Sequence, residues 1–153
     1  MLKISKHISY REAIHSATAK RRGLNNTPND TQLDNMYKVA DFIFEPLRTF
    51  VGGAIKITSF FRSLEVNTAI GGSTKSQHCK GQAIDIDDVF GHKTNYEMFE
   101  YIRDNLDFDQ LIYEFGTNDN PDWIHISYVS KKENRNRVLR AIRENGKTKY
   151  ELY

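Results

Sequence analysis

One histidine and two carboxylates stand close together in a short stretch of the sequence. Residues 73–87 read STKSQHCKGQAIDID, a polar loop with His78 that runs directly into an apolar strand containing Asp85 and Asp87. A carboxylate buried on such a strand is costly unless a partner compensates its charge, and a metal ion is one of the few partners strong enough. The stretch therefore predicts that His78 and Asp85 share a metal ion.

A third metal ligand is expected from a neighbouring strand. Catalytic zinc sites usually take three protein ligands from histidine and carboxylate side chains and leave the fourth position to water. The segment DWIHIS supplies His125. Its neighbours in the sequence are apolar, and an imidazole without a binding partner is unfavourable in such a setting. If residues 110–114 and 123–127 pair as a hairpin, the two-residue period of a strand puts Trp123 and His125 on one face and brings Glu114 near the metal.

The combined pattern resembles that of a known peptidase family. The motif SxHxxGxAxD, which starts at Ser76, and the later WxH, which ends at His125, are similar to those of the zinc D-alanyl-D-alanine carboxypeptidases. These enzymes cleave peptidoglycan stem peptides and recur as phage endolysins. The segments SATAKRRGLNNTP and ITSFFRSLEVNTAIGGSTKSQH extend the resemblance over most of residues 10–130.

The resemblance implies a role for each residue that matches the motif. It implies that His78, Asp85 and His125 bind zinc. It also implies that Arg62 holds a substrate carboxylate, which agrees with the two-donor fork that a guanidinium offers to a carboxylate. Ser76, two residues before the first ligand, is expected to hydrogen-bond the substrate or to shape the loop.

Two carboxylates compete for the role of general base. Related enzymes often place a glutamate or aspartate three residues before the last histidine, and that position is Asp122 in PDWIH. Glu114 competes through the hairpin argument, and because FDQLIYEFG resembles sequences of the phage branch. Either carboxylate can take a proton from water activated by the metal and return it to the leaving amine. The sequence leaves both candidates open.

The elements around this site predict an α+β fold, a small and mostly antiparallel sheet with flanking helices and the zinc site on the sheet face. The chain has 153 residues, of which 39% are hydrophobic, so we expect a single domain over residues 1–153. Helices are expected at residues 10–22, 31–50 with an interruption near Pro46, 63–70, 95–106 and 134–145. Strands are expected at residues 52–61, 83–87, 109–115, 123–129 and 149–153.

Charge and composition argue against several other classes of protein. The 22 basic and 20 acidic residues leave a net charge of +2, which argues against a dedicated nucleic-acid surface. The single cysteine, Cys79, excludes an intrachain disulfide and a cysteine-based zinc cluster. No segment has the apolar length of a signal peptide or a membrane span. We therefore expect a monomer that is made in the cytoplasm and has no membrane or nucleic-acid partner. The family resemblance implies that it acts on the bacterial cell wall, with a phage gene as one source.

The expected function is hydrolysis of amide bonds in peptidoglycan stem peptides by a zinc-dependent peptidase, either carboxypeptidase-like or endolysin-type. One alternative is a catalytically silent wall-binding or virion-structural module with the same fold. The presence of all three ligands and of a candidate base counts against it. A second alternative is a metal-stabilised scaffold, which closed four-ligand coordination would reveal. Which peptide bond is cut does not follow from the sequence.

Overall fold

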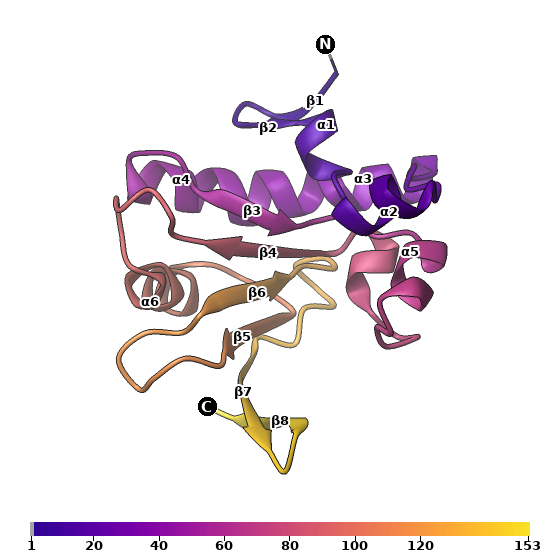
Figure 1. Ribbon diagram of the computed structural model, residues 1–153. Helices are drawn as coiled ribbons and strands as arrows, with labels where there is room; N and C mark the ends of the chain where they lie inside the picture. Colours follow the sequence, from indigo (N-terminus) through magenta and orange to yellow (C-terminus); the bar gives the residue numbers. More distant parts are fainter. Residues whose placement is uncertain (1) are drawn as a thin grey trace.

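A computed structural model describes residues 2–153 (Figure 1). Its centre is a six-stranded sheet with the strand order β3-β4-β6-β5-β7-β8. Neighbouring strands are antiparallel except for β5 and β7, which are parallel. The strands are β3 (Lys56–Ser59), β4 (Ala83–Asp87), β5 (Gln110–Glu114), β6 (Trp123–Ser127), β7 (Arg137–Glu144) and β8 (Lys147–Leu152). The predicted α+β fold with a mostly antiparallel sheet is confirmed.

Short elements lie along the chain before and between these strands. Near the N-terminus, β1 (Lys3–Ser5) and β2 (Ile8–Ser9) form a separate two-stranded sheet. The loop before β4 contains η2 (Gln77–Lys80), a single 3₁₀ turn. The α-helices are α1 (Tyr10–Ala13), α2 (Ala17–Arg22), α3 (Asp30–Val39), α4 (Glu45–Val51), α5 (Leu64–Ala69) and α6 (Asn95–Asn105). Among the described residues, no helix combines the length and the apolar character needed to cross a membrane.

The long helical segment that follows residue 29 is continuous but irregular. The π-helical η1 (Ala40–Phe44) joins α3 to α4, and Pro46 lies in the first turn of α4. Because proline has no N–H to donate and its ring crowds the preceding turn, the chain widens into a π-turn ahead of it. The predicted interruption near Pro46 therefore takes the form of a π-turn, and the helix axis continues.

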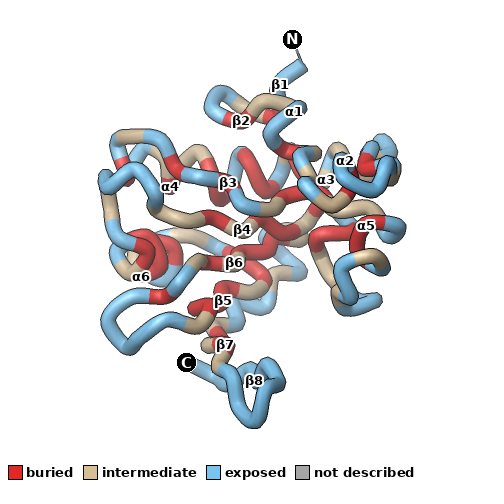
Figure 2. The backbone as a smooth tube through the Cα atoms, viewed as in Figure 1, coloured by how far each residue is buried: buried red, intermediate tan, exposed pale blue. Residues whose placement is uncertain are grey.

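The two faces of the sheet carry different side chains, because successive residues of a strand point to opposite faces. On β4, Ile84 and Ile86 are buried in the main core, and Asp85 points to the other face. The same alternation on β5 and β6 sends four more apolar side chains into that core, namely Leu111, Tyr113, Ile124 and Ile126. Helices α3, α4 and α6 cover this apolar face, and burial is concentrated there (Figure 2). The opposite face is left for polar residues.

The predicted helix at residues 134–145 is wrong. Residues Arg137–Glu144 form β7, which pairs with β5 on one side and β8 on the other. The apolar residues of this stretch occur in adjacent pairs, at 138–139 and 141–142, which fits a helix better than the alternation of a strand. The free edge of β5 decides the outcome, because pairing there satisfies backbone groups that would otherwise lack partners. Asn145 and Gly146, with φ of 54° and 75°, form the turn between β7 and β8. This Asn-Gly dipeptide is the hairpin signal that the helical interpretation overlooked.

The predicted helix at residues 10–22 is divided in two. It ends for the first time at Ala13, and a second helix begins after Ser16, whose hydroxyl accepts a hydrogen bond from the Ala19 amide at 3.1 Å. A serine in this N-cap position starts a helix because it satisfies an amide that has no partner within the helix. Gly23, at a φ of 64°, ends the second helix as predicted.

Candidate active site

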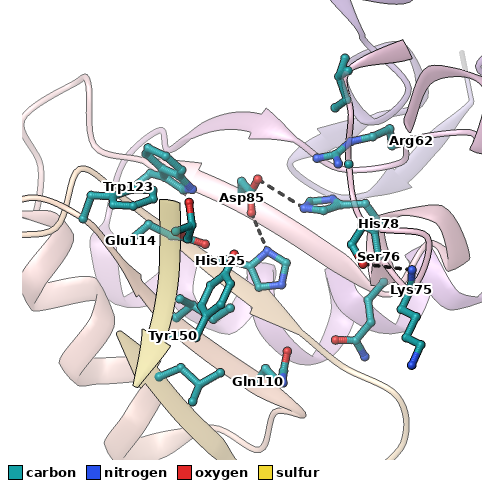
Figure 3. A pocket seen from close by; sticks show the side chains of 18 of the residues that line it. Arg62, Lys75, Ser76, His78, Asp85, Gln110, Glu114, Trp123, His125 and Tyr150 are labelled. Carbon is teal, nitrogen blue, oxygen red and sulfur yellow. Dashed lines mark hydrogen bonds and ion pairs between the residues drawn. The ribbon is translucent and has the colours of Figure 1, made fainter. Parts of the chain in front are cut away.

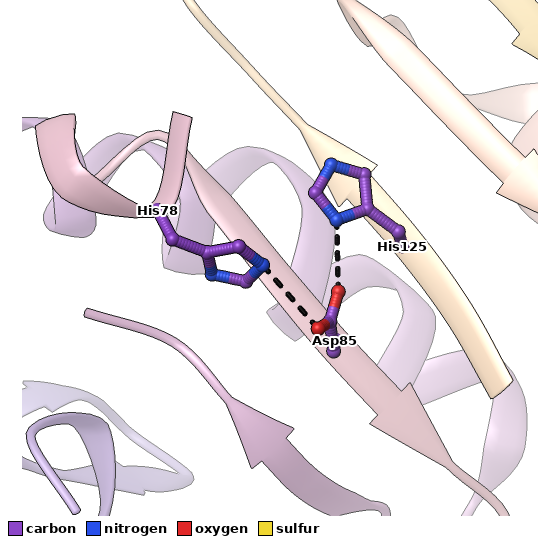
Figure 4. Close-up of side chains that lie close together, drawn as sticks. All are labelled: His78, Asp85 and His125. Carbon is purple, nitrogen blue, oxygen red and sulfur yellow. Dashed lines mark hydrogen bonds and ion pairs between the residues drawn. The ribbon is translucent and has the colours of Figure 1, made fainter. Parts of the chain in front are cut away.

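Three side chains from three different elements converge on the polar face of the sheet. His78 comes from η2, Asp85 from β4 and His125 from β6, where Asp85 and His125 are direct cross-strand partners. The Asp85 carboxylate lies between the two rings, with Oδ2 at 3.3 Å from His78 Nε2 and Oδ1 at 2.8 Å from His125 Nδ1 (Figure 4). The predicted proximity of the three residues is therefore confirmed.

The backbone fixes the orientation of the His78 ring. His78 Nδ1 donates a hydrogen bond to the Phe60 carbonyl oxygen at 2.7 Å, and the ring is buried. Nε2 is then the ring nitrogen that faces Asp85, at 3.3 Å from Oδ2. A metal-binding histidine usually donates the N–H of its other ring nitrogen to a carbonyl or carboxylate in this way.

The cluster fits the requirements of a catalytic zinc ion. One nitrogen or oxygen atom from each residue lies within 4.8 Å of the others, and within residues 2–153 no fourth histidine, cysteine, aspartate or glutamate joins them. Burial raises the pKa of Asp85, but the charge of His78 and the hydrogen bonds from both histidines outweigh it, so the pKa lies well below its usual range. An ionised carboxylate with two imidazoles is a typical zinc ligand set, and an unfilled fourth position is typical of catalytic sites.

A cleft of about 800 Å³ opens above this cluster (Figure 3). Arg62 and Ser76 line it, as do the three residues of the cluster. Glu114 lines it as well, on β5 opposite Trp123 of β6. The predicted pairing of residues 110–114 with 123–127 is confirmed, and it places Glu114 on the same face as His125.

Glu114 is buried at the edge of the cluster, with 7% of its surface exposed. Burial is the main cause that raises its pKa to about 7. The nearby charge of His125 opposes this rise, and the charge of Asp85 adds to it. A carboxylate with a pKa close to neutrality can both accept and release a proton under physiological conditions.

Asp122 occupies a different position from Glu114. It is exposed, precedes β6 by one residue, and lines a smaller neighbouring cleft of about 480 Å³ together with Phe115 and Trp123. The two candidates are nevertheless close along the backbone, because the Asp122 amide donates a hydrogen bond to the Glu114 carbonyl oxygen at 2.9 Å. Only Glu114 is among the residues that line the larger cleft.

Polar neighbours hold Arg62 in place, and none of them neutralises its charge. Its Nη1 donates to Asn67 Oδ1 at 3.1 Å and its Nη2 donates to Ser59 Oγ at 3.4 Å. Gly72 is required here, since a Cβ at this position would lie 2.2 Å from Asn67 Oδ1 and 3.3 Å from Arg62 Nη1. The guanidinium thus keeps donors available to a ligand in the cleft.

A buried aspartate that the sequence did not single out anchors the turn that carries His78. Asp109 accepts a hydrogen bond from Gln77 Nε2 at 2.9 Å and forms an ion pair with Arg135, whose Nη2 lies at 2.7 Å. The hydrogen bonds from Arg135 outweigh burial and hold the pKa of Asp109 below its usual range. Asp109 therefore ties η2 to β5 and to the segment that leads into β7.

The sequence also missed the residues that β7 and β8 add to the cleft, because the helical interpretation took residues 137–144 out of the sheet and left the strand expected at residues 149–153 without a partner. They are Arg137, Leu139, Arg143, Thr148 and Tyr150. The Asn-Gly turn signal at residues 145 and 146 would have placed them on two paired strands.

Comparison with known proteins agrees with this geometry. A search of curated protein sequences finds no match. The model of the family described as Peptidase M15 matches residues 6–127, about four fifths of the chain, and this range includes the whole His78, Asp85 and His125 cluster. This match confirms the resemblance to the zinc D-alanyl-D-alanine carboxypeptidases, and it implies a metallopeptidase that acts on peptidoglycan peptides. The chain belongs to the peptidase M15 family.

Proposed function

We propose that this protein is a zinc-dependent peptidase that hydrolyses amide bonds in the stem peptides of peptidoglycan, as a D-Ala-D-Ala carboxypeptidase or as an endolysin-type enzyme acting on the bacterial cell wall. The observation that carries the proposal is the convergence of His78, Asp85 and His125 at a cleft that also contains a buried glutamate and an arginine with free donors. Family membership supports the same reaction class.

In this proposal His78, Asp85 and His125 hold the metal. A zinc ion held there would polarise the scissile carbonyl and would lower the pKa of a bound water molecule to about 7. The Phe60 carbonyl keeps the His78 ring in its ligating tautomer. In the described part of the chain the cluster has three such residues, which argues against a closed scaffold site with a fourth protein ligand.

Arg62 is proposed to bind a carboxylate of the substrate peptide next to the bond that is cut. A bidentate pair between guanidinium and carboxylate fixes both the distance and the orientation of the bound group. Ser76, which lines the same side of the cleft, is proposed to hydrogen-bond the peptide backbone.

A carboxylate is proposed to take a proton from the attacking water and to deliver it to the leaving amine. Burial in the cleft and a pKa of about 7 support Glu114. The position three residues before His125, where related enzymes often carry their base, supports Asp122. The backbone hydrogen bond between the two residues puts both at the same end of the β5–β6 hairpin.

The test is digestion of purified, defined muropeptides, with the products identified by mass spectrometry. The zinc-supplied protein is expected to release fragments whose masses identify a single type of amide bond. Treatment with a chelator should stop the reaction, and added zinc should restore it. If the zinc-supplied protein cleaves no muropeptide, the proposal fails and the silent wall-binding or virion-structural alternative replaces it.

A further inference from the structure

The side of the cleft farthest from Arg62 is built by the β7–β8 hairpin, residues 137–152. The hairpin lies at the opposite end of the sheet from β3 (Figure 1). Tyr150 from this hairpin lies beside His125 and Glu114 in the cleft (Figure 3). The hairpin lies entirely beyond residues 6–127, so the family match does not account for it.

The strand register explains why alternate residues of the hairpin face the cleft. Gln110, Ile112 and Glu114 of β5 point to the polar face, and their partners on β7 therefore point there too. The partners are Arg137, Leu139 and Ala141, followed two residues later by Arg143. Pairing with β8 extends this face, because Ala141 lies opposite Tyr150 and Arg143 lies opposite Thr148.

Two guanidinium groups on the cleft-facing side of the β7–β8 hairpin have no acidic partner. Within residues 2–153, neither the Arg137 nor the Arg143 side chain forms an ion pair or a hydrogen bond. The Arg143 guanidinium lies over the Phe115 ring, 4.9 Å from its centroid. Phe115 in turn packs against Trp123, with 5.4 Å between ring centroids.

The backbone at Phe115 adopts a conformation that is rare for an aromatic residue and fixes the position of its ring. Its φ of 56° lies in the left-handed region, which a bulky aromatic residue rarely adopts because of steric strain. The next residue, Gly116, tolerates no side chain, because a Cβ would lie 2.3 Å from the Asn120 carbonyl oxygen. The turn thus holds the Phe115 ring where it supports Arg143.

We propose that the β7–β8 hairpin is a second recognition site for the substrate, in which Arg143 binds a carboxylate other than the one bound by Arg62, and Arg137 adds a positive charge at the other end of β7. This inference rests on the proposed function. Cations on both sides of the cleft, Arg62 and Lys75 on one and the two hairpin arginines on the other, favour a peptide with more than one negative charge. A γ-linked glutamate in a stem peptide has such a group, because its α-carboxylate stays free.

The test compares two peptides that differ in one charge. One is a stem peptide whose γ-linked glutamate has a free α-carboxylate, and the other has a carboxamide there. Trp123 is the only tryptophan in the chain and it lines the cleft, so its fluorescence in the first milliseconds after mixing reports binding before turnover. We expect the zinc-supplied protein to bind the carboxylate peptide on the order of tenfold more tightly.

The double variant Arg137→Gln/Arg143→Gln should lose this preference and bind the carboxamide peptide as the parent does. Both side chains are exposed, so the variant should keep the parent's melting temperature, and Arg143→Gln alone serves if the double variant is unstable. Lys147→Gln/Lys149→Gln is the matched control, because it removes two positive charges from the opposite face of the hairpin and should keep the preference.

Equal binding of the two peptides by the parent, or a preference that survives in the double variant, would overturn the inference. So would an equal loss of affinity for both peptides. Cleavage of the same peptides is recorded in parallel. If the parent prefers the carboxylate peptide but cleaves neither, the recognition site stands and the proposed peptidase function falls.

Discussion

Asp85 is the residue on which the chemistry of the site depends. It stands between two isoleucines that are buried on the other face, and its charge is compensated by two histidines from separate elements. This arrangement keeps a carboxylate ionised where burial alone would favour its neutral form. The pattern of apolar, acidic and apolar residues in AIDID thus reflects a strand with a core face and a reactive face.

Substitution of Arg62 tests whether this guanidinium is the substrate clamp. Arg62→Ala should lower kcat/KM for peptides with a terminal carboxylate, because a charge-assisted pair is lost. The decrease should correspond to a loss of roughly 2–4 kcal/mol of transition-state stabilisation. Zinc content, measured by elemental analysis, should not change. Cleavage at the parent rate would show that another residue holds the carboxylate. Lys20→Ala, on the exposed surface of α2, is the control for loss of a positive charge.

At the scale of elements, the position of the site depends on the attachment of one 3₁₀ turn to the sheet. His78 is carried by η2, and Asp109 connects that turn to β5 through Gln77 and to the β7 segment through Arg135. Asp109 is buried, although half of the Arg135 side chain is exposed. The network is therefore expected to stabilise both the fold and the placement of a metal ligand.

Asp109→Asn should lower the free energy of unfolding by about 2 kcal/mol at neutral pH, because a buried charge-assisted network is broken. The pKa of Asp109 is lowered in the folded state, so its stabilising effect is present above its unfolded pKa of about 3.9 and is lost as the pH falls through the folded value. The difference between parent and variant should therefore shrink below about pH 4. Urea unfolding at pH 7 and pH 3.5 measures it, and a difference that does not change with pH would exclude the ionised network.

The metal-binding cluster was more predictable from the sequence than the β7–β8 hairpin that borders the cleft. The two-residue alternation in AIDID and WIHIS identified both strands and the face that carries Asp85 and His125, because one buried face imposes a strict pattern. Residues 137–144 lack such a pattern, since arginine stems cover apolar surface on both faces of β7. Their strand conformation depends on the edge of β5, which is a tertiary contact.

For the whole molecule, the proposed site links metal binding to stability. Strands β4 and β6 and the turn η2 meet at the cluster, so an ion bound there joins the η2–β4 segment to β6, whose His125 lies 40 residues after Asp85. A ligand that binds only the folded state raises its stability in proportion to the logarithm of its concentration over its Kd.

Removal of the metal should therefore lower the melting temperature. For an ion present at about 1,000 times its Kd, the loss is about 4 kcal/mol, or roughly 10 °C for a chain of this length. Differential scanning calorimetry before and after chelation, with elemental analysis of both samples, provides the measurement. The His78→Ala/His125→Ala double variant should show no response to the chelator. An unchanged melting curve after verified removal of zinc would argue against the three-residue site.

The central claim, that this cleft is a zinc peptidase centre with a carboxylate base, is tested most directly by comparing Glu114→Gln with Asp122→Asn. Both variants should fold and keep the zinc content of the parent, because neither side chain belongs to the metal cluster. The rate of cleavage of a defined muropeptide is then measured for each variant and for the parent. We predict that the parent cleaves it and that only one variant loses on the order of 10²-fold or more in rate. Near-parental rates in both variants would contradict the role of the base, and a zinc-loaded parent that cleaves no muropeptide would contradict the account as a whole.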